Sequence, residues 1–176
     1  MQPIVIVGSG LAGYTLLKEF RKRDRETPVT LVSRDDGAFY SKPGLSNALA
    51  ANKSAAELAG ASAGEMAADL DATVLARTTV RAIDTAARRI THDGGGIDYA
   101  KLVLALGADP LAHGLGGDAA GGVFTVNDLA DYARFREAVE DKVRVAVLGG
   151  GLIGCEFAND LVQAGYAVDV VHAGPW

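Results

Sequence analysis

The sequence contains a single cysteine, Cys155, among its 176 residues. An internal disulfide and a zinc cluster of several cysteines are therefore excluded, and we expect no metal site. Basic charge is also scarce, because 17 Lys and Arg against 22 Asp and Glu give a net charge of −5. This balance disfavours nucleic acid and anionic membranes as partners. No apolar run approaches the ~20 residues of a membrane-spanning helix. A lone cysteine suits a reducing compartment, so we expect a soluble, cytoplasmic protein.

Apolar residues make up 49% of the sequence, and their pattern predicts an α/β fold with a packed core. Residues 3–8 and 28–33 are apolar without polar alternation, which is typical of strands buried on both faces of a parallel sheet. Residues 11–24 lie between them with helical spacing, and the three segments form a β-α-β unit. A second such unit begins at Val143 and ends with a strand at 167–171.

The chain between these two units has weaker signals. An Ala-rich helical region extends to about residue 70, and the Gly-rich residues 93–100 are predicted to be a hairpin loop. The predicted strands and the predicted helix of this region are 72–76, 79–84, 88–93, the start of 101–110, and 127–142. Residues 111–122 contain five glycines and no periodicity, as a linker would. We therefore expect two domains, residues 1–112 and 113–176.

The first unit carries three glycines in G-x-G-x-x-G spacing where its strand turns into its helix. Gly8 permits the tight exit from the strand, Gly10 lets a pyrophosphate approach the backbone, and Gly13 lets the helix pack closely. The positive end of the helix then faces the phosphates. The candidate binding residues of this turn are Gly8, Ser9, Gly10, Leu11, Ala12 and Gly13.

A carboxylate for ribose hydroxyls is expected at the end of the next strand. Ser33 stands at that strand end, and Asp35 lies 22 residues after Gly13, just beyond the usual position. Arg34 and Asp35 are therefore candidate contacts for the nucleotide.

The same glycine spacing recurs 141 residues later, again between a strand and a helix. The candidate binding residues there are Gly149, Gly151, Leu152, Ile153, Gly154 and Glu156. Two such turns predict two dinucleotides, a resident flavin and a diffusible nicotinamide, with hydride passing between their rings. Cys155 is expected to be a small buried apolar residue of this helix.

With both turns present, the sequence resembles the FAD-dependent pyridine nucleotide–disulfide oxidoreductases. The segments "YSKPGLS" (40–46), "LVLALGA" (102–108) and "GCEFANDL" (154–161) are similar to those of rubredoxin–NAD reductases, including flavorubredoxin reductases. The similarity extends from Ile4 to about Val171. Relatives with a redox-active disulfide carry a C-x4-C pair near residues 39–50, and this sequence has no cysteine there. The resemblance therefore implies an external electron acceptor.

In that family a lysine matching Lys42 lies against the reactive edge of the flavin and pairs with a glutamate matching Glu156. A cation at this edge stabilises the negative charge that a flavin gains on reduction, and a carboxylate holds the lysine in place. The alternative is that Lys42 is a solvated loop residue and Glu156 an exposed helix residue. The resemblance also places several residues near the FAD: Pro43 beside the lysine, the backbone of Val80, and Ala105 to Gly107.

Members of the family return to the FAD domain after the nicotinamide domain, so the second Rossmann-like unit is expected to be inserted in the first and truncated here. The resemblance implies NADH, more than NADPH, as reductant, FAD as carrier and a rubredoxin-like protein as acceptor. Turnover of NADH by this chain alone is not expected. Alternatives left open are a ferredoxin or flavorubredoxin reductase and a truncated nucleotide-binding module. An NADH oxidase or peroxidase is disfavoured, because those relatives use a cysteine near residues 40–50.

Overall fold

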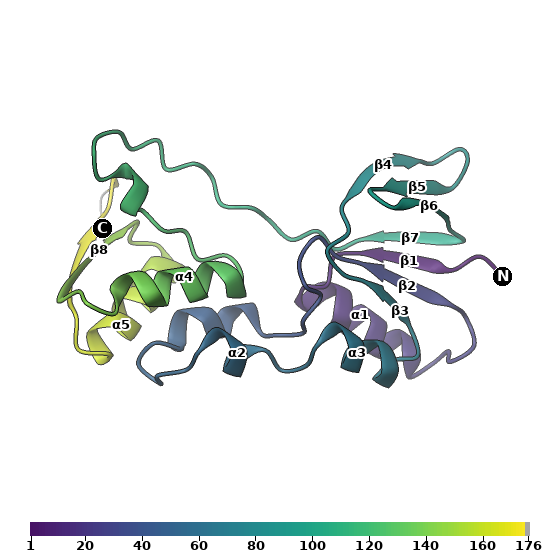
Figure 1. Ribbon diagram of the computed structural model, residues 1–176, viewed down its shortest axis with the longest axis horizontal. Coiled ribbons are helices and arrows are strands. Elements are labelled where there is room, and N and C mark those ends of the chain that lie inside the picture. Colours follow the sequence, from purple (N-terminus) through teal and green to yellow (C-terminus); the bar gives the residue numbers. More distant parts are fainter. Residues whose placement is uncertain (175–176) are drawn as a thin grey trace. The chain divides into compact units, whose positions relative to one another are not determined.

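The computed structural model describes residues 1–174, and the chain divides into two compact units (Figure 1). The first unit comprises residues 1–40 and 59–108, and the second comprises residues 41–58 and the chain from Asp109 onward. Pro175 and Trp176, which end the expected second domain, lie outside the described residues.

The first unit is built on a sheet of four parallel strands in the order β3-β2-β1-β7. The strands are β1 (Ile4–Val7), β2 (Val29–Val32), β3 (Thr73–Leu75) and β7 (Lys101–Leu104). β1 and β2 are bridged by α1 (Leu11–Arg21), in the predicted β-α-β order. The predicted α/β architecture with parallel strands is therefore confirmed.

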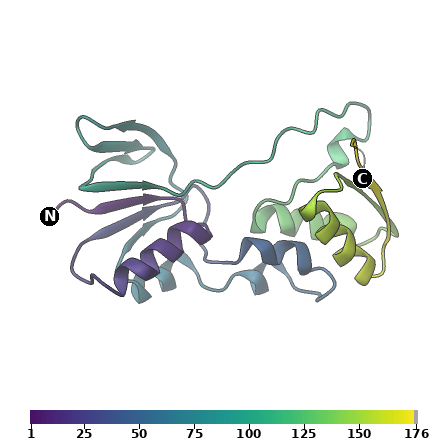
Figure 2. The ribbon, with the colours of Figure 1, turned by 180° about the vertical axis from the view of Figure 1, so that it is seen from behind.

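Both faces of this sheet are covered, which explains why its strands have no polar alternation. Ile6, Leu31 and the α1 residues Tyr14 and Leu17 form one apolar cluster, to which Met66 of α3 (Ala63–Asp69) contributes. The opposite face is covered by an antiparallel sheet of β4 (Val80–Asp84), β5 (Arg89–His92) and β6 (Gly95–Asp98), which lies on that side of the parallel strands in Figure 2. Residues of this second cluster include Val5, Val7, Val32, Ile90 and Tyr99.

The second unit contains a parallel pair, β8 (Arg144–Leu148) and β9 (Ala167–Val171), joined by α5 (Leu152–Gln163). Before it come η2 (Ala120–Gly122) and α4 (Leu129–Val139), which begins after Asp128. The Asp128 carboxylate accepts the N–H of Asp131 at 2.8 Å and so caps the start of α4. Phe135 of α4 meets Phe157 of α5 edge to face, with ring centroids 6.0 Å apart.

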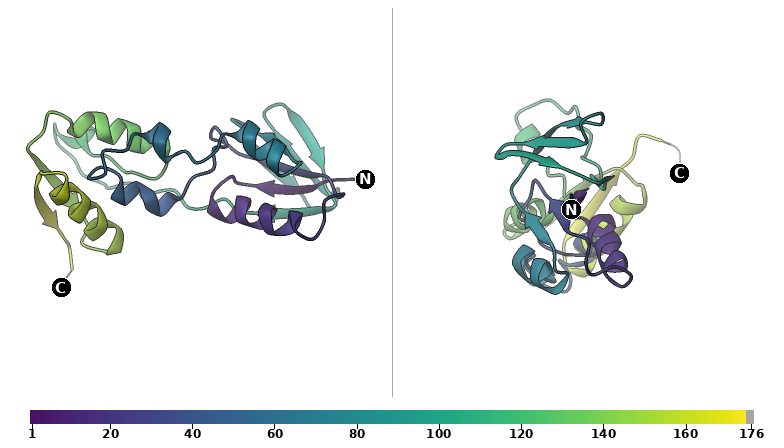
Figure 3. Two further views of the ribbon diagram at one scale, coloured as in Figure 1. Left: turned by 90° about the horizontal axis from the view of Figure 1, so that it is seen from below. Right: turned by 90° about the vertical axis from the view of Figure 1, so that its right-hand side faces the viewer.

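Residues 41–58 carry η1 (Lys42–Asn47) and α2 (Ala55–Leu58), which contact α5 and α4 respectively (Figure 3). The sequence places this segment with residues 1–112, whereas the structure groups it with the second unit. The reason is tertiary, because hydrogen bonds to side chains of α4 and α5 hold its backbone. The division also falls at residues 108 and 109, four residues before the expected boundary.

The predicted hairpin loop at 93–100 is wrong in its extent: the turn between β5 and β6 occupies residues 93–94, and residues 95–98 form strand β6. Backbone pairing with β5 does not require large side chains, and the buried Tyr99 that follows β6 anchors it in the second apolar cluster. Composition alone hides a strand of this kind, since Gly is depleted in strands generally.

Candidate functional site

In the first unit the expected binding residues gather at the carboxyl ends of the parallel strands. The turn 8–13 follows β1, Arg34 and Asp35 follow β2, and residues 105–107 follow β7. Because all four strands are parallel, these ends meet at one edge of the sheet, where ligands of open α/β sheets bind.

The glycine turn at 8–13 has the geometry that its spacing predicts. A Cβ on Gly13 would lie 1.9 Å from the Gly8 carbonyl oxygen, and one on Gly8 would lie 2.1 Å from the Ala105 oxygen. A Cβ on Gly10 would meet no atom within 4 Å. The outer glycines are therefore required by packing, while the middle one borders open space. Gly10 is the N-cap of α1 and supplies no side-chain hydrogen bond, so the first helical N–H groups remain available for an anion.

Asp35 is tied to the glycine turn by a small hydrogen-bond network. Its Oδ1 atom accepts the Ser9 hydroxyl at 3.0 Å, the Ser33 hydroxyl at 2.5 Å and the Gly37 N–H at 2.9 Å. Ser9 and Ser33 are buried and their hydroxyl oxygens lie 2.6 Å apart. Asp35 itself is exposed, so its position is set while its second oxygen remains near solvent.

The other expected contacts of the first unit lie around the same edge. Ala105 donates its N–H to the Val7 carbonyl at 2.8 Å and lies against Gly8, and Gly107 has a φ of +70°. Val80 begins β4, directly after a segment in which Thr78 donates its N–H to the Ser33 carbonyl at 2.8 Å. Arg34 is exposed in the loop after β2.

The turn at 149–154 repeats the first one. A Cβ on Gly154 would lie 1.9 Å from the Gly149 oxygen, and one on Gly151, the N-cap of α5, would meet nothing within 4 Å. Gly149 has a φ of +107° and donates its N–H to the Val171 carbonyl at 2.8 Å, which joins the turn to the end of β9. Leu152 and Ile153 are 88% and 68% exposed, so the first turn of α5 presents apolar side chains outward.

Both turns therefore fit the diphosphate of a dinucleotide. Each combines an open middle glycine with a helix whose N-terminal N–H groups have no side-chain cap. Residues 8–13 with Asp35 would hold the phosphates and ribose of one nucleotide, and residues 149–154 would hold the phosphates of the other.

Lys42 and Glu156 both belong to the second unit, but they have different hydrogen-bond partners. The Lys42 Nζ atom donates to Asn127 Oδ1 at 2.6 Å, and Glu156 Oε2 accepts the Ser46 hydroxyl at 2.7 Å. Within residues 1–174 the structure contains no ion pair between the two. Ser46 lies four residues after Lys42 in η1, so the expected lysine–carboxylate contact is replaced by one between the same two elements. Pro43 follows Lys42 at the start of η1 and is exposed.

Cys155 and His172 lie near the second turn. Cys155 was expected to be buried, and His172 had no expected role. Cys155 is exposed, not buried, and its Sγ atom lies 3.5 Å from the Gly150 carbonyl oxygen. The reason is that the buried residues of α5 are Asp160 and Leu161, towards its end. His172 accepts the Gly150 N–H on Nδ1 at 3.1 Å, so it contacts the turn from the end of β9.

Sequence reasoning missed the polar partners of these residues, namely Ser46, Asn127 and Asp160. Asp160 is buried and its carboxylate accepts the N–H groups of Leu49 at 2.8 Å and Ala50 at 3.1 Å. A sequence signal existed, because Asp160 follows Glu156 by four residues and so lies on the same face of α5.

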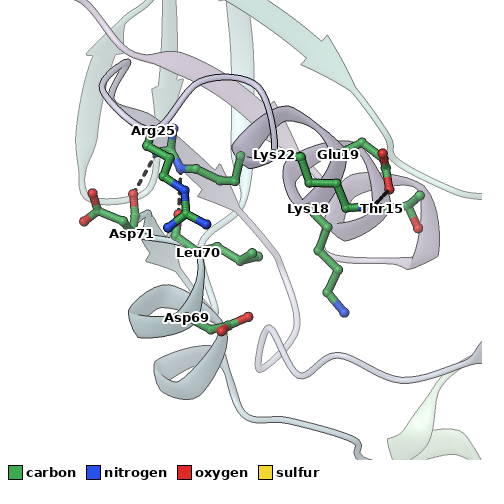
Figure 4. A pocket seen from close by; sticks show the side chains of 9 residues that line it. Thr15, Lys18, Glu19, Lys22, Arg25, Asp69, Leu70 and Asp71 are labelled. Carbon is green, nitrogen blue, oxygen red and sulfur yellow. Dashed lines mark hydrogen bonds and ion pairs between the residues drawn. The ribbon is translucent and has the colours of Figure 1, made fainter.

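A cavity of about 390 Å³ lies elsewhere in the first unit, beside the later half of α1. Figure 4 shows its charged lining, with Lys18, Lys22 and Arg25 from the α1 side and Asp69 and Asp71 opposite. None of the expected nucleotide contacts lines it. The cavity therefore does not mark the candidate site.

Within residues 1–174 there is neither a candidate metal-binding cluster nor a helix suited to span a membrane. No group of three or more His, Cys, Asp or Glu is placed to hold a metal ion. None of the helices described has the length and apolar character needed to cross a membrane.

Comparison with known proteins agrees with this geometry. The family model described as pyridine nucleotide-disulphide oxidoreductase matches residues 2–176. The chain belongs to this family. A rubredoxin-NAD(+) reductase of Alcanivorax borkumensis is 52% identical over 98% of the chain, and a nitric oxide reductase FlRd-NAD(+) reductase of Aliivibrio fischeri is 38% identical over 97%.

Among solved structures, the covalent putidaredoxin reductase–putidaredoxin complex matches 96% of the chain with a TM-score of 0.84 and 29% identity. The chain covers 42% of that protein chain, and it spans 45% of the length of each of the two reductases named above. The chain is thus a member of the family, and it spans less than half the length of each of these relatives.

Proposed function

We propose that the full-length protein containing this chain is an FAD-dependent oxidoreductase that passes electrons from NADH to a small rubredoxin-type iron protein. The observation that carries the proposal is the repeated turn, in which the last glycine is closed by packing and the middle glycine is open. The chain belongs to a family whose model it matches over residues 2–176. The similarity to a rubredoxin-NAD(+) reductase supports the choice of acceptor.

The residues have separate parts in this proposal. The turn 8–13 and the start of α1 hold the FAD diphosphate, and Asp35 accepts hydrogen bonds from its ribose. The turn 149–154 holds the NADH diphosphate at the start of α5. When bound, FAD would supply the redox chemistry, namely uptake of two electrons from NADH and their release in single steps.

Lys42 supplies positive charge at the flavin edge. Glu156 holds the segment that carries Lys42, because it accepts the hydroxyl of Ser46. The exposed ammonium of Lys42 is held by the neutral Asn127 amide, so its charge is not cancelled by that partner. Hydride transfer itself requires geometry and not a proton donor, so no acid–base residue is assigned.

NADH is proposed over NADPH on the resemblance to rubredoxin–NAD reductases alone. The relatives that support this are named as NAD(+) reductases. A cytoplasmic location is proposed for the same protein, because its exposed Cys155 would remain a free thiol there.

The proposal is tested on the purified full-length protein. We expect it to be yellow, to lose its flavin absorbance on adding NADH, and to reduce rubredoxin with kcat/KM at least about tenfold above ferredoxin or a flavorubredoxin. A colourless protein that does not take up FAD would contradict the flavoprotein assignment. Preference for ferredoxin or flavorubredoxin would instead keep the flavoprotein and replace the acceptor.

A further inference from the structure

Segment 42–50 is fastened to α5 by two carboxylates of that helix. Glu156 accepts the hydroxyl of Ser46 at 2.7 Å, and Asp160 accepts the backbone N–H groups of Leu49 and Ala50 at 2.8 and 3.1 Å. The two carboxylates are four residues apart, so they lie on one face of α5 and contact successive parts of the segment.

Asp160 is the more deeply placed of the two. Its exposed fraction is 4%, whereas Glu156 is exposed. The amides that it accepts follow directly after η1 and its C-cap Ala48, so the carboxylate holds the chain where it leaves this helix. Since Leu49 is also buried, its N–H has little access to water and depends on this carboxylate.

The next residues are held from the other side by α4. The Tyr132 hydroxyl donates to the Lys53 carbonyl at 2.8 Å, and Arg136 donates to the same carbonyl at 3.0 Å and to Asn52. Burial raises the pKa of Tyr132, Arg136 lowers it, and the charge of Asp160 raises it further. Tyr132 and Arg136 of α4 thus hold residues 52 and 53, while Glu156 and Asp160 of α5 hold residues 46, 49 and 50.

Lys42 is the first residue of the same short helix, η1, whose far end Asp160 holds. We infer that Asp160 is a positioning residue for Lys42: by capping residues 49 and 50 it fixes η1 on α5 and so sets where the lysine charge lies. This inference rests on the proposed function, in which Lys42 faces the flavin. It links the helix that begins at the second glycine turn with the charge at the flavin edge.

The test compares full-length holoprotein variants in a double-mutant cycle of Asp160→Asn with Lys42→Ala. Asparagine keeps the size of the side chain but turns an amide donor toward one of the two backbone N–H groups. Two quantities are measured: the midpoint potential of the bound flavin, and hydrogen exchange of the backbone in residues 45–53. Asp169→Asn, an exposed β9 carboxylate near Arg144, is the matched control.

We expect Asp160→Asn to lower the flavin potential, to slow flavin reduction by NADH about tenfold, and to speed exchange in residues 45–53 about tenfold. In the Lys42→Ala background it should leave the potential unchanged while still speeding exchange. The Asp169→Asn control should move neither quantity. If Asp160→Asn yields no flavin-bound protein, Asp160→Ser, which keeps one acceptor oxygen, is measured in the same way.

The outcomes separate the inference from the function on which it rests. Equal shifts of potential with and without Lys42 would show a general structural role and overturn the inference, as would no shift in either background. If Lys42→Ala alone leaves the potential unchanged, the role proposed for Lys42 fails, and the inference fails with it. If Lys42→Ala lowers the potential and Asp160→Asn does not, only the inference is overturned.

Discussion

The glycines of the two turns differ in whether a side chain would fit at their positions. Gly13 and Gly154 each lie so close to the carbonyl of the first glycine in their turn that a Cβ would come within 1.9 Å of it. Gly10 and Gly151 border open space. One residue type therefore serves two purposes within each turn, close packing at the last glycine and ligand access at the middle one.

This difference predicts that one alanine variant loses stability while the other loses affinity for FAD. Gly13→Ala should destabilise the protein by roughly 1–3 kcal/mol or more, because the new methyl group meets backbone. Gly10→Ala should change the free energy of unfolding by less than about 1 kcal/mol, since its φ of −63° suits alanine. It should nevertheless weaken FAD binding about tenfold, because the methyl group occupies the space that phosphate needs.

Urea unfolding of the flavin-free protein and titration with FAD measure these two quantities. Gly64→Ala in α3, where a Cβ also meets nothing within 4 Å, is the control and should bind FAD normally. Unchanged FAD affinity in Gly10→Ala would argue against a nucleotide in this turn.

Tyr14 makes the stability of the first unit depend on pH in the alkaline range. Its hydroxyl is fully buried and donates to the Gly37 carbonyl at 2.5 Å. Burial, together with the charges of Asp35 and Asp36, raises its pKa from 10.0 to about 12. The folded state therefore favours the neutral phenol, and this stabilisation is present below pH 10 and is lost as pH rises toward about 12.

The variant Tyr14→Phe isolates this effect. At neutral pH it should be less stable by roughly 1–2 kcal/mol, because the buried Gly37 carbonyl loses its donor. Between pH 10 and about 12 the difference in stability between wild type and variant should shrink. Urea unfolding over this range measures it, and a constant difference would contradict the raised pKa.

Among the elements, α1 is fastened at its end by a buried arginine. Arg21 is 6% exposed and donates to the carbonyls of Leu70, Asp71, Asp24 and Thr27 at 2.6–3.1 Å. These contacts join the end of α1 to the chain after α3 and to the loop before β2. Arg21, Leu70 and Asp71 also line the cavity described above.

Arg21→Met should therefore destabilise the first unit by about 2–4 kcal/mol, because the methionine fills the space but leaves the carbonyls unpaired. Arg23→Met, two residues later, removes only an exposed contact with Glu19 and should cost less than about 1 kcal/mol. Thermal and urea unfolding compare the two. Equal losses in both variants would contradict the role given to Arg21.

At the scale of the whole molecule, the chain passes between the two units three times: it enters the second unit after residue 40, returns after residue 58 and leaves again after residue 108. The last crossing leads into residues 109–119, all exposed and without helix or strand. Such backbone is the preferred substrate of proteases.

Limited digestion with thermolysin should therefore cut first before Leu111 or Leu115, both exposed apolar residues. Mass spectrometry of the first products identifies the site. A first cut within residues 41–58 would contradict the anchoring of that segment by α4 and α5. The Asp169→Asn variant, unaltered in this region, serves as a reference for cutting rates.

An element could be predicted from the sequence where it depends on interactions between residues close together in the chain. The strands of the parallel sheet and the helices after each glycine turn depend on neighbouring residues, and they were predicted correctly. Strand β6 was missed because its Gly-rich composition signals a loop, and only pairing with β5 makes it a strand.

The sequence by itself determined the two glycine turns, because strand, glycine spacing and helix all lie within one short stretch and local sterics dictate its form. Only the tertiary structure decided the partners of Lys42, Glu156 and Asp160. Those contacts join residues 85 to 111 positions apart, and hydrogen bonds over such separations depend on how η1, α4 and α5 pack. No local pattern specifies that packing, which is why residues 41–58 were assigned to the other unit.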